Sequence, residues 1–456
     1  MVLFRNYSGS PADEGLRAEQ LPYFFVIFVS FVVKKFPPSL SGRMRTLRLE
    51  PGHSQSNGDF ISKSSGILKH TAMDYKQRFK LFFFLQFFSV GIIGPYLVAF
   101  LNQKGFSGGQ LGLILGALPI AGLMFQPAWS FLSDIMNQRR TLLQIALAGL
   151  ILASFGLGYA ESFLGVFLWM ILFSAMRAPI SPIIFAIILD YLEEKDEVDS
   201  FSLLRLWGSV GFGVSTLIIG GLFLDNIVVY FPWLNAGVFL LMGLLSQFLP
   251  ERGRSFVYHG FKDLSELVKN AQFVFYLIGS LFVGASFGIY HNYLTLFLQT
   301  LQASSWVVGL SNSLQAFVEI PVMLAVPFML KKLSRRQIIL LGALILPIRW
   351  LLYFFVQQPG WILPIQLVHG LPVVSFFVVS VAFVDRLVNP KFRATGQALY
   401  STMVMGIGSG LGVYAAGRVI EAYGVRQVWL LNFVLGLVGL GILFIIFRRV
   451  KPGHQH

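Results

Sequence analysis

Apolar runs long enough to cross a lipid bilayer recur along most of this chain. A bilayer-spanning helix needs roughly 20 mostly apolar residues. Six such runs occupy residues 79–101, 111–132, 142–160, 163–188, 203–224 and 228–249, and six more occupy 273–298, 307–330, 338–356, 362–384, 398–420 and 428–447. Backbone groups inside a bilayer must be hydrogen-bonded within the protein, so each run predicts a helix. The expected fold class is an all-α membrane protein with 12 transmembrane helices.

Composition agrees with a bilayer environment and removes several chemistries. The chain is 55% hydrophobic and only 12% charged, which is more apolar side chain than a soluble core of this size buries. It has no cysteine, which excludes disulfides, thiolate metal sites and cysteine nucleophiles. The dipeptide Gly-Lys of a P-loop and the H-E-x-x-H zinc motif do not occur. We therefore expect no enzyme activity, no cofactor and no bound metal.

The basic residues orient the helices. Lys and Arg concentrate in cytoplasmic loops of membrane proteins. Basic clusters that fall on one side of the predicted helices are Arg139/Arg140, Lys195, Arg252/Arg254/Lys262/Lys269, Lys331/Lys332/Arg335/Arg336, Arg386/Lys391/Arg393 and Arg448/Arg449/Lys451. The opposite loops carry little more than Lys104, Arg418 and Arg426. Both termini are therefore predicted to be cytoplasmic, and the net charge of +14 is interpreted as a topology signal, without nucleic-acid binding.

Domain boundaries follow from the gaps between runs. The stretch 251–270, "ERGRSFVYHGFKDLSELVKN", is the longest polar gap and predicts a cytoplasmic linker between six-helix bundles at 73–250 and 271–450, with a tail at 451–456. Residues 1–72 fall outside the pattern, because their apolar run 21–33 is too short to span a bilayer comfortably and no small-residue cleavage site follows it. We expect an N-terminal extension that is poorly ordered or absent from the native protein.

The two halves resemble each other. The second run is followed by "SFLSDIMNQRR" and the eighth by "PFMLKKLSRR", and Asp190 and Asp385 stand at the inner ends of the fourth and tenth runs. A repeat of six spans in the same orientation predicts two bundles related by an axis along the membrane normal.

Local motifs add a family resemblance over about residues 73–450. The segment "LLRLWGSVGFG" (203–213) resembles the R-x-W-G-S-x-G signature of the major facilitator superfamily, in the branch of phenylpropionate permease-like proteins and nucleoside:proton symporters. Asp190 and "GFSGGQLGLILGALP" (105–119) fit the same branch. The resemblance implies secondary transport and a charged cytoplasmic gate. The gate residues would be Asp134, Arg139, Asp190, Arg205 and Trp207, of which Arg205 and Trp207 could equally contact substrate.

Ionisable residues within the apolar runs are the candidates for coupling. An ionised side chain at mid-bilayer costs at least ~2.5 kcal/mol, so it usually faces a cavity or a partner. Glu319 lies near the middle of the eighth run, Arg349 is in the ninth and His369 in the tenth. Lactose permease-type symporters carry these residue types on the same spans, which implies that this group couples proton movement to transport. The alternative is a fixed Glu319–Arg349 ion pair that only holds the second bundle together.

A second group of residues is expected to bind substrate. Arg177 is central in the fourth run, and Pro179 and Pro182 after it leave backbone carbonyls unpaired and can bend the helix. An arginine there suits an anionic or hydroxyl-rich solute, or pairs with a neighbour. Further polar candidates for the same space are Gln86, Tyr96, Gln126, Asn235, His291 and Gln315.

Together these features predict a proton-coupled symporter, a monomer in a bacterial cytoplasmic membrane. Its partners would be protons, the lipid bilayer and a small organic solute that is an aromatic acid, a nucleoside or a sugar. A proton-driven exporter, a facilitator, a non-transporting membrane sensor and a multi-span lipid-modifying enzyme are the alternatives. A sensor would be expected to carry an added signalling domain, which the short tail after Arg449 does not provide. An enzyme would be expected to carry a coherent catalytic group near a membrane face, and none is found in the sequence.

Overall fold

A computed structural model describes residues 73–136, 138–197, 200–250, 267, 269–389 and 392–449. The predicted extension at 1–72, nearly all of the linker at 251–270 and the tail at 451–456 lie outside these residues. The chain divides into two compact units, Met1–Gln77 and Arg78–His456. The second unit carries the predicted spans and all the contacts reported below.

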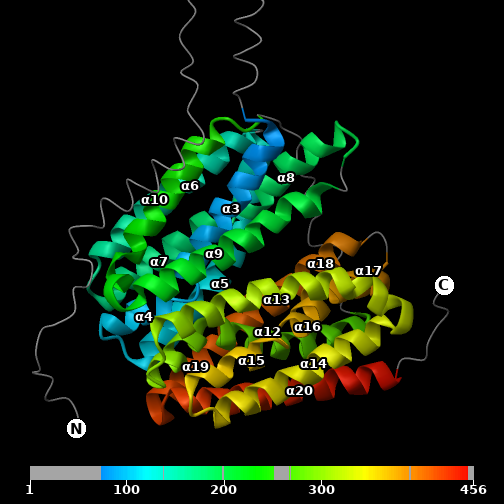
Figure 1. Ribbon diagram of the computed structural model, residues 1–456. Coiled ribbons are helices and arrows are strands. Elements are labelled where there is room, and N and C mark those ends of the chain that lie inside the picture. Colours follow the sequence, from blue (N-terminus) through cyan, green and yellow to red (C-terminus); the bar gives the residue numbers. More distant parts are fainter. Residues whose placement is uncertain are drawn as a thin grey trace, which may run out of the picture. The chain divides into compact units, whose positions relative to one another are not determined.

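Helices account for all regular structure in the described ranges. The first half contains α3 (Tyr75–Ile93), α4 (Leu97–Gln103), α5 (Gly108–Met136), α6 (Arg139–Tyr159), α7 (Phe163–Arg177), α8 (Ile180–Glu193), α9 (Phe201–Ile227), the 3₁₀ turn η3 (Val228–Tyr230) and α10 (Phe231–Ser246). The second half contains α12 (Ala271–Thr300), α13 (Ser305–Lys332), α14 (Arg335–Phe355), η5 (Pro359–Trp361), α15 (Ile362–Gln366), α16 (Gly370–Val374), η6 (Ser375–Val379), α17 (Ser380–Leu387), α18 (Arg393–Ser401), η8 (Thr402–Gly408), α19 (Ser409–Tyr423), η9 (Val425–Gln427) and α20 (Val428–Arg449). In Figure 1 the first half runs from blue to green and the second half from green to red.

The helix count confirms the predicted membrane fold with one shorter member. Among the described residues, 11 helical segments are long and apolar enough to cross a membrane. The remaining predicted run, 228–249, forms η3 and the 16-residue helix α10. A helix rises about 1.5 Å per residue, so α10 alone is shorter than a typical hydrocarbon core of about 30 Å.

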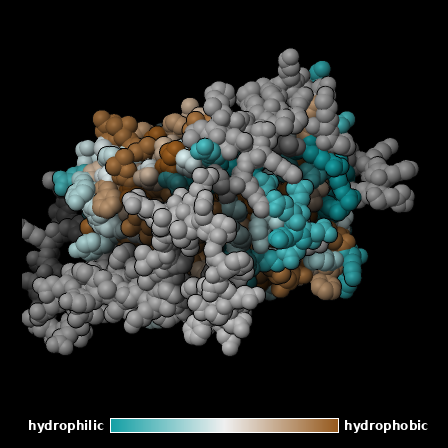
Figure 2. Space-filling model, turned by 90° about the horizontal axis from the view of Figure 1, so that it is seen from above, coloured by the Kyte–Doolittle hydropathy of each residue, from teal (hydrophilic) through white to brown (hydrophobic). Residues whose placement is uncertain are grey.

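Burial differs strongly between spans. In the first span of each half, Tyr75–Gln103 and Ala271–Thr300, 72% of the most apolar stretch is buried inside the protein. In Ser305–Lys332 the corresponding share is only 22%. Large apolar side chains remain exposed along single faces of peripheral helices such as α14 and α20. Exposed apolar faces of this length require a lipid environment. Hydrophilic surface gathers mainly at the right of the view in Figure 2, the side on which α14 begins and α20 ends in Figure 1.

The predicted bend of the fourth span occurs at its prolines. Helix α7 ends at Arg177 and α8 begins at Ile180, on either side of Pro179. A proline has no N–H to offer the carbonyl four residues earlier, which here is Ala175. The indole Nε1 of Trp129 in α5 donates to that carbonyl at 2.8 Å, so the break is stabilised from a neighbouring span.

The two halves pack backbone against backbone at the ends of the spans opposite to the basic loops. A Cβ atom added to Gly309 of α13 would lie 2.4 Å from the backbone nitrogen of Gly221 in α9. One added to Gly417 of α19 would lie 2.5 Å from the Cα of Gly112 in α5. Neither contact leaves room for a side chain, so the halves are tightly closed at this end, which the basic loops predict to be the outer end.

Candidate functional site

Arg349 is the centre of a buried polar network in the second half. Its side chain is fully buried, and its guanidinium lies over the rings of Tyr290, Trp350 and Tyr353 at 4.3, 4.8 and 5.4 Å from their centroids. Tyr353 follows Arg349 by one helical turn, and its hydroxyl accepts a hydrogen bond from Nη2 at 3.1 Å. Aromatic faces attract a cation, so these rings offset part of the cost of burying the charge.

Gln366 completes the surroundings of the guanidinium. Its Oε1 accepts from Arg349 Nη2 and from the hydroxyls of Tyr290 and Tyr353, both at 3.0 Å, and its Nε2 donates to the carbonyl of Ser311 at 2.9 Å. The Tyr290 hydroxyl is also 3.0 Å from Oε1 of Gln315. This network joins α12, α13, α14 and α15 and fixes the position of the guanidinium.

His369 links this network to Glu319. Arg349 Nη1 lies 2.7 Å from His369 Nδ1. A guanidinium can only donate, so Nδ1 accepts and the proton of the neutral ring is on Nε2. That nitrogen lies 3.4 Å from Oε1 of Glu319 without meeting the geometry of a hydrogen bond. Protonation of the ring at Nδ1 would place two N–H groups against each other, so the carboxylate is the better place for an additional proton.

Glu319 therefore does not pair directly with Arg349, and the fixed ion pair considered from the sequence is wrong for this conformation. Within the described part of the chain, Arg349 forms no salt bridge with a carboxylate, and His369 lies between the two groups. The Glu319 side chain is 23% exposed, whereas His369 is fully buried. The cation that acts on Glu319 from the other half is Arg205 of α9. Glu319 thus lies beside a neutral imidazole and interacts electrostatically with a cation of the opposite half.

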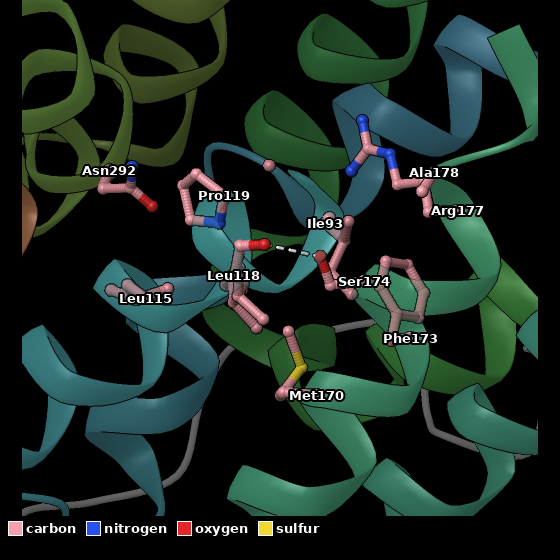
Figure 3. A pocket seen from close by; sticks show the side chains of 13 residues that line it. Ile93, Leu115, Leu118, Pro119, Met170, Phe173, Ser174, Arg177, Ala178 and Asn292 are labelled. Atoms are coloured by element: carbon pink, nitrogen blue, oxygen red, sulfur yellow. Dashed lines mark hydrogen bonds between the residues drawn. The ribbon is translucent and has the colours of Figure 1, made fainter. Parts of the chain in front are cut away.

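A separate cavity of about 360 Å³ contains Arg177. Its walls come from α3, α4, α5, α7 and the turn before α8 in the first half, with Asn292 of α12 from the second. Figure 3 shows Arg177 and Asn292 on opposite sides of this space, with Ser174 between them donating to the Leu118 carbonyl at 2.6 Å. Among the described residues, Arg177 forms no hydrogen bond and no ion pair, and its side chain is exposed to the cavity.

The other residues predicted to line this space do not reach its wall. Tyr96 is fully buried, with its hydroxyl donating to the Thr216 carbonyl at 2.6 Å, and Asn235 is fully buried in α10, so neither can touch a solute in this conformation. Gln86 donates to Ser181 Oγ at 2.7 Å, and Gln126 is exposed near the inner end of α5. Gln315 belongs to the Arg349 network. These positions are corrections to the expected cavity lining.

His291 lies close to the Arg349 network. Its ring centroid is 6.2 Å from that of His369 and 5.1 Å from that of Tyr290. Its Nδ1 lies 2.9 Å from the Phe287 carbonyl one turn earlier in α12. The structure therefore places His291 beside the Arg349 network and away from the walls of the Arg177 cavity.

The predicted gate residues are found at the inner ends of the spans. Arg139 is almost fully buried, and its Nη1 lies 2.6 Å from Oδ2 of Asp190, which joins the start of α6 to α8. Arg205 lies over the ring of Phe87 at 3.9 Å, and Trp207 is 42% exposed. The side chain of Asp134 lies outside the described residues.

Asn292, Gln366 and Tyr353 are among the contributors that were not identified from the sequence. Asn292 follows His291 in an apolar run, and Gln366 and Tyr353 are polar residues within the tenth and ninth runs. Their positions inside apolar runs are the signal that could have identified them. Glutamine and tyrosine are common in helix interfaces, however, and only the fold shows which of them contact a buried charge.

Comparisons with known proteins agree with this architecture. The MFS_1 like family model matches residues 76–431. Maltose permease of Geobacillus stearothermophilus is 28% identical over 390 residues, with 83% of this chain and 96% of that protein covered. A probable 3-phenylpropionic acid transporter of Escherichia coli is 25% identical over 373 residues, with 80% and 95% covered.

The nucleoside permease NupG of Escherichia coli is related in both sequence and structure. It is 23% identical over 417 residues, with 84% of this chain and 99% of that protein covered. The crystal structure of the nucleoside transporter NupG superposes with a TM-score of 0.75 over 83% of this chain and all of that chain. The chain thus belongs to the MFS_1-like family of the major facilitator superfamily, and it is a multi-pass membrane transporter of small solutes, not an enzyme.

Proposed function

We propose that this transporter is a proton-coupled symporter that imports a small organic solute by alternating access. The observation that carries the proposal is the chain of contacts from Arg349 through His369 to Glu319. A buried guanidinium fixes the imidazole tautomer, and the imidazole then presents an N–H to a carboxylate that has only partial access to water. The carboxylate of Glu319 is the proton carrier in this account.

Protonation of Glu319 changes its attraction to both neighbours. The ionised carboxylate attracts the Nε2–H of His369 within its own half and the charge of Arg205 in the opposite half. The neutral acid loses the charge–charge part of both attractions, so α9 and α13 are held together less strongly near Arg205. A proton bound here therefore alters how firmly the two halves are joined at the inner end, which is what coupled transport requires.

The cavity around Arg177 is the proposed solute site. A volume of about 360 Å³ suits a small molecule, since small-ligand pockets start near 300 Å³. The unpaired guanidinium of Arg177 can bind a carboxylate or a pair of hydroxyls in its planar fork, and Asn292 and Ser174 can bind further polar groups. Relatives of this chain are named for maltose, nucleosides and 3-phenylpropionic acid. The first two solutes carry hydroxyl groups, and the third carries a carboxylate. We infer a solute of this size with an anionic or hydroxyl-rich group, transported across a bacterial cytoplasmic membrane.

Solute-induced proton movement tests the function directly. The purified protein would be reconstituted in vesicles, and aromatic acids, nucleosides and sugars would be added outside while the external pH is recorded. A symporter makes the external medium more alkaline when its solute is added, and an imposed inward proton gradient drives accumulation. Transport of a solute with no pH change and no response to the gradient would identify a facilitator and contradict the proposal.

A further inference from the structure

A second cavity, of about 320 Å³, lies at the basic end of the second half, away from the transport site. It is formed where α14 begins and α20 ends. Its described lining combines two guanidiniums, two polar side chains and an apolar floor, and it contains no carboxylate. The lining residues are Ser334, Arg336, Gln337, Leu340, Phe444, Phe447 and Arg448.

The two arginines are held over aromatic rings. The guanidinium carbon of Arg448 lies 4.4 Å from the ring centroid of Phe444, and that of Arg336 lies 5.9 Å from the ring centroid of Phe447. Among the described residues, Arg448 forms no hydrogen bond and no ion pair, so its N–H groups remain available to an acceptor. Stacking on the ring of Phe444 orders the guanidinium of Arg448 without using its N–H donors.

The start of α14 adds to the positive potential. Ser334 and Gln337 form a capping box, which fixes the first turn of this 21-residue helix beside the cavity. The N-terminus of a helix carries a partial positive charge and favours an anion. Lys331 and Lys332 end the preceding helix α13 on the same side of the membrane. Charge complementarity therefore points to an anionic ligand with several oxygen acceptors.

The apolar side of the cavity continues into the exposed apolar faces of α14 and α20. On α14 the exposed residues Leu341, Leu344, Ile348 and Leu352 repeat at helical spacing and form one face. On α20 the exposed face includes Leu437, Phe444 and Ile445. A ligand that fills the cavity can thus extend an apolar chain along these faces, while its charged group stays at the basic end.

We propose that this cavity binds the phosphate-bearing headgroup of an anionic phospholipid from the cytoplasmic leaflet. Arg336 and Arg448 bind the phosphate oxygens, and Leu340 and Phe444 contact the first carbons of the acyl chains. Basic pockets between transmembrane helices on the cytoplasmic side are suited to such headgroups, and each basic residue near an anionic membrane surface strengthens binding by about five-fold. A soluble phosphate compound shares the charge but has no use for the apolar face.

The test compares phospholipid selectivity between matched variants of the full-length protein. Spin-labelled phosphatidylglycerol and phosphatidylcholine would be added to the reconstituted protein, and the motionally restricted fraction of each would be measured by electron paramagnetic resonance. R336Q/R448Q removes the two guanidiniums of the cavity. K331Q/K332Q removes two cations from the same side that do not line it, and is the control for general surface charge.

The proposal predicts that R336Q/R448Q lowers the preference for phosphatidylglycerol by at least about five-fold more than K331Q/K332Q does, because both variants remove two cations from the membrane surface and only R336Q/R448Q removes the donors of the cavity. L340W, which fills the cavity without changing charge, should lower the preference to a similar extent as R336Q/R448Q. Monodisperse gel filtration of each variant shows that it is folded, and R448Q alone replaces the double variant if that fails.

Three results would overturn the assignment. Equal losses in both double variants would show that general surface charge attracts the lipid. An unchanged preference in R336Q/R448Q would show that the cavity binds no lipid. Displacement of the restricted phosphatidylglycerol by millimolar inorganic phosphate, added at constant ionic strength, would identify the cavity as a site for a soluble anion.

Discussion

Replacing Glu319 with glutamine should lower the free energy of unfolding far less than the loss of a buried ion pair would. Among the described residues, the carboxylate has one ion-pair contact, in which Oε1 of Glu319 lies 3.4 Å from Nε2 of His369. This contact does not meet hydrogen-bond geometry. A well-formed hydrogen bond to a charged group contributes about 1.5–3 kcal/mol, so we expect this contact to contribute about 1 kcal/mol or less. If Glu319 instead formed a buried ion pair with Arg349, removing it would cost about 3–5 kcal/mol.

A double-mutant cycle separates these two arrangements. Unfolding of E319Q, R349Q and E319Q/R349Q would be followed in detergent by intrinsic fluorescence against temperature and denaturant. Because His369 lies between the two groups, the coupling energy between positions 319 and 349 should stay below about 1 kcal/mol. The variant E421Q, which breaks the exposed Arg418–Glu421 contact, controls for the loss of one carboxylate. A coupling energy of 3 kcal/mol or more would refute the arrangement described here.

Three further predictions concern the cavity, the outer closure and the topology. R177K keeps the charge but loses the planar fork, so it should weaken solute binding about ten-fold in equilibrium titrations. The control R140K changes an arginine away from the cavity and should leave the affinity unchanged. If R177K bound solute as tightly as the unmodified protein, Arg177 would not be part of the site. G309V forces α13 away from α9 at the outer end, so a cysteine that replaces Asn292 should be labelled more rapidly by a reagent added outside. Unchanged labelling would show that this contact does not close the cavity. In intact cells, F106C should react with an impermeant thiol reagent and K269C should not, and the reverse pattern would invert the predicted orientation.

The spans could be predicted from the sequence because the bilayer imposes the same requirements on all of them. Each must be helical, apolar and about 20 residues long, so hydropathy alone locates helices such as α6 and α14 closely. Helix α10 is shorter than the predicted run 228–249, since Val228–Tyr230 forms a 3₁₀ turn and the helix ends at Ser246. Hydropathy records the apolar length of a segment, and it does not record where local backbone geometry changes.

The candidate site was predictable only in part. The cost of burying a charge correctly selected Glu319, Arg349 and His369 as neighbours, since such groups need partners. Sequence position gives the depth of a residue along its helix, but it does not give the direction in which the side chain points. For this reason the order of contacts, with His369 in the middle, could not be predicted, and Tyr96 and Asn235 were expected in a cavity although they are buried between helices.

Transport by E319Q tests the central claim most directly, because this variant separates solute movement from proton movement. Glutamine imitates the protonated carboxylate permanently, so the two halves can still change conformation with solute bound, but no proton can be released. Vesicles loaded with solute should therefore exchange it for labelled solute at a rate near that of the unmodified protein. The same vesicles should fail to accumulate solute when a pH gradient is imposed, whereas E421Q should accumulate it normally. Accumulation by E319Q to the same ratio as the unmodified protein would contradict the assignment of Glu319 as the proton carrier.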